Sequence, residues 1–143
     1  MSYEKLLLLP VFAHVAMILA SVYRLGFSRV AAVRRGDVKV KDIALDPEKW
    51  PDELRKRANN YRNQFELPVL FYLLTILTII TRQADLLFVL LAWVFVLLRV
   101  FQALVHVTSN NVRYRGAFFG AGAIVLLIMW IIFMVRFLLG GVP

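Results

Sequence analysis

The chain has 143 residues, 61% of them hydrophobic, and a formal net charge of +8. A soluble domain is roughly 45–50% apolar, so this composition and the mean hydropathy of +0.73 exclude an ordinary soluble core. The lack of cysteine excludes disulfides and thiolate ligands, and two histidines are too few for a multi-histidine centre, so no metal site is predicted. In a membrane protein the distribution of basic residues sets the orientation across the bilayer. We therefore do not interpret the net positive charge as a nucleic-acid-binding surface and expect no nucleic-acid partner.

The first apolar block, residues 6–25, is long enough for a membrane span, which needs about 20 apolar residues. A cleaved signal peptide is the alternative, because Lys5 precedes the block and the small residue Ala20 lies near its end. Against this, the helical pattern continues towards Arg29 and the positive start is weak. His14 lies inside this span, where we expect one interhelical hydrogen bond and no catalytic role.

Residues 26–60 are polar and basic and form the predicted first loop. Gly36 followed by Asp37 is a turn signal. Pro51 followed by two acidic residues is typical of a helix start, and that helix would lead into the second span. The stretch is too short for a separate soluble domain, so we interpret residues 1–143 as one membrane domain.

The second span, residues 61–81, begins with an unusual group of polar side chains. In a helix, Arg62 and Glu66 are four residues apart and Asn63 and Glu66 three apart, which places all three on one face. A carboxylate at the edge of hydrocarbon is costly unless it is paired, so this group is a candidate site. The alternative is a salt-bridged helix end at the level of the lipid headgroups. Pro68 leaves the carbonyl of Gln64 without its helical partner, which predicts a kink.

The third and fourth spans are predicted at residues 86–107 and 116–139. On the third, Arg99, Gln102 and His106 have the spacing i, i+3 and i+7, which makes one polar stripe on an apolar helix. An arginine at mid-span costs about 2.5–3.5 kcal/mol, so it should face the bundle interior and find a partner. Glu66 is the partner expected from its level in the second span. That pair would either belong to a site or hold two helices in register.

The basic residues predict the orientation of this all-α, four-helix integral membrane protein. The first loop carries nine basic residues and the third loop carries Arg113 and Arg115, whereas the opposite side has only Lys5 and Arg82, with Arg136 near the end of the last span. The positive-inside rule therefore places the first and third loops in the cytoplasm and both termini outside. The expected location is the bacterial inner membrane.

With these residues in place, the chain resembles the MAPEG family, the membrane-associated proteins in eicosanoid and glutathione metabolism. The resemblance rests on the sequence from Arg62 to Glu66 with Pro68 closely after, and on Arg99 and Arg115 at similar spacing. It extends over nearly the whole chain.

The resemblance implies a homotrimer that binds glutathione as co-substrate at the protomer interface. Arg62, Asn63 and Glu66 would hold the glutathione backbone and amine, and Arg115 would be the catalytic residue, lowering the pKa of the thiol. Three further residues would line the same cavity: Arg99, Gln102 and His106. The family's well-characterised enzymes have a tyrosine in the place of His106 and often a ring in the place of Gln102.

Two function classes therefore stay open. The first is a glutathione-dependent transferase or peroxidase that acts on a lipophilic electrophile from the bilayer, and the intact Arg62, Asn63, Glu66 and Arg115 favour it. The second is a non-catalytic lipid-binding or interaction protein, which the two changed ring positions favour. A small transporter or channel fits less well, because the polar groups gather at one end of few spans.

Overall fold

The computed structural model describes residues 1–140, and the described residues contain helices and no strand. The elements are α1 Tyr3–Arg35, α2 Val40–Ile43, the 3₁₀ helix η1 Pro47–Lys49, α3 Asp52–Asn63, α4 Leu67–Ile80, α5 Leu86–Val107 and α6 Val112–Leu139. Four rods are long and apolar enough to cross a membrane: α1, α3 with α4, α5, and α6. The predicted all-α fold with four membrane-spanning helices is confirmed.

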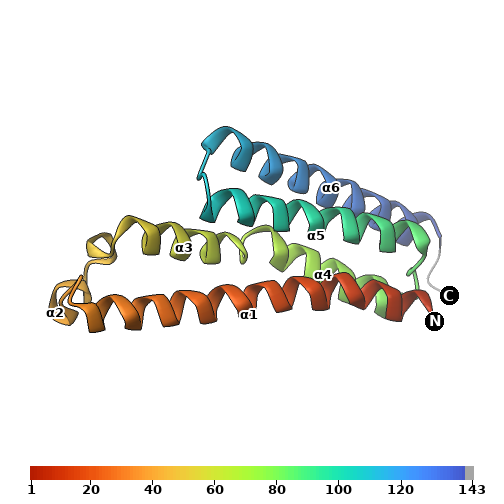
Figure 1. Cartoon of the computed structure of the whole chain (residues 1–143). Coiled ribbons are helices and arrows are strands. Elements are labelled where there is room, and N and C mark those ends of the chain that lie inside the picture. The colour runs from red at the N-terminus through yellow and green to blue at the C-terminus, as the bar shows by residue number, and fades with distance from the viewer. Residues whose placement is uncertain (141–143) are drawn as a thin grey trace.

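The four rods run alternately up and down, so that both described chain ends lie at one end of the bundle (Figure 1). We call this the terminal end. The other end carries the connection from α1 to α3 and the connection from α5 to α6, and we call it the basic end. At the basic end, α1 and α3 project beyond the α5–α6 connection (Figure 1).

Helix α1 is longer than the predicted first span. Its 33 residues are about 50 Å long at 1.5 Å per residue, whereas the hydrocarbon core is about 30 Å thick. The helix ends at Gly36, whose φ of 78° is left-handed and whose N–H bonds to the carbonyls of Ala32 and Val33. The predicted loop of residues 26–60 is therefore helical over much of its length. Basic side chains can stay in water on a helix that projects from the bilayer, so the polar residues after Leu25 do not end α1.

The second rod is interrupted between Asn63, where α3 ends, and Leu67, where α4 begins. Pro68 lies in the first turn of α4, where its missing N–H breaks no helical hydrogen bond. The kink predicted from this proline is confirmed as a break of three residues. The break places α3 and α4 on either side of a polar segment inside the bundle.

The apolar core fills the half of the bundle nearer the terminal end. Phe71 of α4 stacks on Phe95 of α5 with 4.7 Å between ring centroids, and Leu7 and Leu74 are fully buried beside them. Large apolar side chains also remain exposed along the outside of α4, α5 and α6. Such surfaces suit lipid or another protein rather than water. Apart from Thr75 and Thr78, the buried polar side chains lie nearer the basic end.

Candidate functional site

Arg99 is the largest fully buried side chain of the protein. Its Nη2 donates to the backbone carbonyl of Asn63 at 2.5 Å and to Oε1 of Gln64 at 3.3 Å. Its guanidinium carbon lies 5.7 Å from the ring centroid of Phe119. Asn63 is the last residue of α3, so the cation caps the negative end of that helix.

The expected ion pair between Arg99 and Glu66 is not formed within the described part of the chain. The helix break explains the difference. It brings the freed end of α3 to Arg99, whereas Glu66 becomes the residue before α4 and its side chain is exposed. A backbone carbonyl and an amide therefore satisfy the cation in place of a carboxylate.

Gln64 lies in the break and joins side chains from α1, α3 and α5. Its Oε1 faces Nε2 of His14 at 3.3 Å as well as Arg99, and its Nε2 donates to Oδ1 of Asn60 at 3.2 Å. Because Oε1 only accepts, Nε2 of His14 carries the ring proton, and Nδ1 accepts from the hydroxyl of Tyr72 at 2.5 Å. His14 thus makes the interhelical contact that was expected, on both of its ring nitrogens.

On the outer side of the break, Asn63 and Glu66 contact one another. The amide of Asn63 oriented with its nitrogen towards Glu66 places Nδ2 at 3.0 Å from Oε2 and 3.3 Å from Oε1. The opposite orientation would leave its oxygen facing only acceptors. Arg62 and Glu66 are exposed on the protomer surface. Asn63 therefore connects two groups, since its carbonyl bonds Arg99 and its amide bonds Glu66.

At the basic end of α5, His106 meets Arg115 from the first turn of α6. Nη1 of Arg115 lies 3.2 Å from Nε2 of His106 and donates to Oδ1 of Asn110 at 2.8 Å. A guanidinium can only donate, so Nε2 accepts and Nδ1 of the neutral ring carries the proton. The two hydrogens of Nη1 are thereby used. Nε and Nη2 of Arg115 have no partner among the described residues.

The polar stripe of α5 contains several buried atoms without a partner in the described part of the chain. They are Nε and Nη1 of Arg99, Oε1 of Gln102 and Nδ1 of His106. Buried polar atoms are nearly always hydrogen-bonded, so such a group requires an explanation. The side chains of all three residues are at most 2% exposed. They form the inner wall of the candidate site rather than its surface.

The model of the MAPEG family matches residues 7–135, nearly the whole chain. The chain belongs to the MAPEG family. Comparison with curated proteins and with solved structures gave no match. Membership makes this a membrane protein of a family that is associated with glutathione and eicosanoid metabolism.

In this MAPEG chain, the predicted site residues divide into two sets. Arg62, Asn63 and Glu66 lie at the break between α3 and α4, and the α5 stripe lies inside the protomer with Arg115 at its basic end. Sequence reasoning did not foresee the roles of Gln64 and Tyr72. The available signal for Gln64 was a polar residue four positions after Asn60 and four before Pro68, which has no N–H for the carbonyl of Gln64.

Proposed function

We propose that the protein binds glutathione and acts as a glutathione-dependent transferase or peroxidase on lipophilic electrophiles. Family membership supports the thiol ligand. The observation that carries the proposal is Arg115, whose Nη1 is fixed by His106 and Asn110 while its other nitrogens have no partner among the described residues. A guanidinium held in this way is suited to stabilise a thiolate, because an adjacent cation favours the charged form of sulfur.

Burial separates the roles of the site residues. Exposed Arg62 and Glu66, together with the amide of Asn63, are the groups that would contact the charged ends of glutathione. Buried Arg99 would hold these groups in place through the carbonyl of Asn63. Four unpartnered polar atoms of the α5 stripe would support the ligand from behind.

The proposed reaction begins at the thiolate, whose sulfur gives its electron pair to an electrophilic carbon of the second substrate. A carbon–sulfur bond forms, and the electron pair of the bond that breaks goes to the leaving group or, in an epoxide, to the ring oxygen. With a hydroperoxide, the sulfur attacks the terminal oxygen and releases an alkoxide, which takes a proton. A second glutathione then reduces the oxidised sulfur and gives the disulfide and water. Arg115 acts in both versions by stabilising the attacking thiolate.

Calorimetric titration of the detergent-solubilised protein with glutathione tests the proposal. Heat of binding together with the ultraviolet difference band of a thiolate near neutral pH is the expected result. Binding without the thiolate band would argue against catalysis. A protein that binds no glutathione would contradict the whole proposal.

A non-catalytic, lipid-binding protein is the second candidate function. One observation favours it: His106 stands where the enzymes have a tyrosine, and Gln102 stands where they often have a ring, and both side chains are buried inside the protomer. In that case the break would serve to shape the bundle, and exposed residues such as Arg62 would contact headgroups or a partner. The same titration with glutathione separates the two candidates.

We further propose a homotrimer in the bacterial inner membrane with the basic end in the cytoplasm. The excess of basic residues on the first and third loops supports this orientation. Because the chain has no cysteine, Asp37→Cys introduces a unique labelling site in the first loop. Labelling only after the cells are opened is expected, and labelling of intact cells from the periplasm would reverse the orientation.

A further inference from the structure

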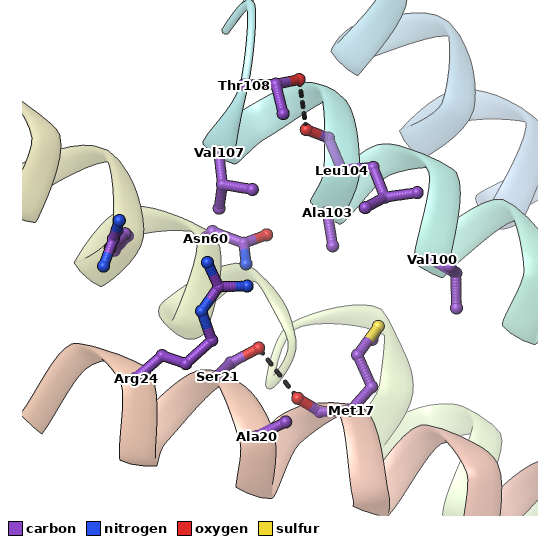
Figure 2. A pocket seen from close by; sticks show the side chains of 11 residues that line it. Met17, Ala20, Ser21, Arg24, Asn60, Val100, Ala103, Leu104, Val107 and Thr108 are labelled. Atoms are coloured by element: carbon purple, nitrogen blue, oxygen red, sulfur yellow. Dashed lines mark hydrogen bonds between the residues drawn. The ribbon is translucent and has the colours of Figure 1, made fainter. Parts of the chain in front are cut away.

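A cavity of about 330 Å³ lies between α1, α3 and α5 at the basic end of the bundle (Figure 2). Its volume falls at the lower end of the range for small-molecule pockets, about 300–1,000 Å³. Each helix presents one face to it. Met17 and Arg24 are seven residues apart on α1, Val100 and Val107 are seven apart on α5, and α3 contributes Asn60 with Arg57 three residues before it.

This cavity is distinct from the proposed glutathione site. At about 100° per residue, Arg57 and Asn60 lie on the inner face of α3, whereas Arg62 projects from its other side. Glu66 lies beyond the end of α3, at the start of α4. Burial agrees with this division, because Asn60 is 3% exposed while Arg62 and Glu66 are exposed. The cavity therefore lies inside one protomer, behind the helix that carries the family motif.

The lining changes from apolar to cationic along the cavity. Helices α1 and α5 both run towards the basic end (Figure 1). The deeper lining is Met17 and Ala20 on α1 with Val100 and Ala103 on α5, and Arg24 lies a turn beyond Ala20. The cavity thus has an aliphatic part towards the bilayer centre and an arginine part towards the basic end.

The positive charge of this cavity is not balanced by the described residues. Arg24 makes no hydrogen bond or ion pair with them, and Arg57 donates only to the hydroxyl of Ser28, at 2.5 Å. In Figure 2 the Arg24 guanidinium reaches towards the amide of Asn60. Because Oδ1 of Asn60 accepts from Gln64, its amide nitrogen remains as a donor. Two guanidinium groups and an amide N–H₂ form a set of donors that suits an oxyanion.

We propose that this cavity binds an anionic, single-chain amphiphile from the bilayer. Its carboxylate or phosphate head would lie between Arg24 and Arg57 with the amide of Asn60. Its acyl chain would lie against Met17, Val100 and Ala103. Aliphatic lining of this extent does not suit a peptide such as glutathione, and a free inorganic anion would leave the apolar part unused.

Photo-crosslinking in phosphatidylcholine nanodiscs tests the proposal with a diazirine derivative of oleate. We expect adducts on residues 17–20 and 100–104, and about tenfold less labelling there with the uncharged diazirine derivative of monoolein. Arg24→Gln combined with Arg57→Gln should reduce oleate labelling by about tenfold. The matched control, Arg34→Gln with Lys56→Gln, removes the same charge from the same two helices outside the cavity and should leave labelling unchanged.

Three results would overturn the proposal. The first is equal labelling by the charged and uncharged probes, and the second is labelling that the Arg24 and Arg57 variants do not change. The third is displacement of oleate by inorganic phosphate or by glutathione, which would assign the cavity to a free anion or to the thiol site. Failure of the glutathione proposal would not affect this test, because the oleate adducts are expected whether or not the protein binds glutathione.

Discussion

The two ends of the bundle differ in how their charged side chains are paired. At the terminal end, Asp85 pairs with Arg136 at 2.8 Å and accepts from the backbone N–H of Phe88, and Arg136 lies over the Phe88 ring. The side chain of Asp85 thus both caps the start of α5 and neutralises Arg136. Towards the basic end, the buried stripe of α5 has four polar atoms without a partner among the described residues, two of them on the charged Arg99, and Arg115 has two such nitrogens. The buried atoms without a partner towards the terminal end belong to the uncharged side chains of Thr78, Gln83 and Trp130.

This difference separates structure from function within one fold. A pair such as Asp85 and Arg136 fixes the ends of α5 and α6 and needs nothing further. Donors in excess of their internal acceptors imply water, a ligand or a partner. The arginines of the family motif, Arg62, Arg99 and Arg115, lie towards the end where charged donors are unpaired.

The largest effect is expected from Arg115→Ala at the basic end. Loss of one preorganised charge-stabilising group typically lowers turnover by about 10²–10³-fold. We expect a fall of this size in kcat, with glutathione binding changed much less, because the lost contact matters most for the thiolate. The measurement is turnover with a lipophilic electrophile, together with the thiolate difference band, which should appear only at higher pH.

Arg136→Ala is the matched control, since it removes the same side chain from the same helix at the terminal end. Its turnover should equal that of the wild type once the amount of folded protein is corrected for. Equal losses in the two variants would mean that the ends do not differ in function.

Gln64→Leu is expected to have the next largest effect, on stability. It removes an acceptor from Arg99 and from His14 and a donor from Asn60. Leaving buried groups unpaired, one of them charged, should cost on the order of 3 kcal/mol in the free energy of unfolding. Gln83→Leu is the control, because Oε1 of Gln83 has no partner in the described chain and its loss should change stability by no more than about 0.5 kcal/mol. Unfolding of both variants in detergent can be compared directly.

A double-mutant cycle sharpens the same point. Arg99→Leu and Gln64→Leu should be non-additive, because the two side chains contact one another. Arg99→Leu and Glu66→Leu should be nearly additive in the absence of ligand, because no ion pair joins them. Strong coupling of Arg99 to Glu66 alone would show that the carboxylate is the true partner of the buried cation.

The sequence predicted the fold well because membrane spans and helix breakers are local signals. Blocks of about 20 apolar residues define the rods, and Pro68 located the break. The length of α1 was missed, because basic residues are compatible with both a loop and a helix in water. The partner of Arg99 was missed for a different reason. Complementary charge suggested Glu66, but the break creates a free backbone carbonyl at Asn63, and such acceptors have no sequence signature.

Arg62→Ala is expected to have a smaller effect, confined to binding. Arg62 is exposed on the outer side of the break, where its contacts to glutathione would be equal in the ground and transition states. Glutathione affinity should fall about tenfold, which corresponds to one charge-assisted contact, while kcat stays unchanged at saturation. Arg34→Ala removes another exposed arginine of the basic end and should leave the titration unaltered. A fall in kcat at saturation for Arg62→Ala would assign it a role in the chemical step.

The smallest effect is expected from Asp85→Asn at the terminal end. The substitution removes the charge that faces Arg136 but keeps a side-chain oxygen for the N–H of Phe88. Asparagine and aspartate are similar helix caps, and the two charged side chains are 39% and 37% exposed, so solvent screens the pair. Partly exposed ion pairs contribute about 0–1 kcal/mol, and the loss in the free energy of unfolding should lie in that range. Asp85→Ala also removes the cap and should cost about 1 kcal/mol more. A large loss with asparagine alone would mean that charge, rather than the cap, fixes this end, and that both ends of the bundle depend on their electrostatics.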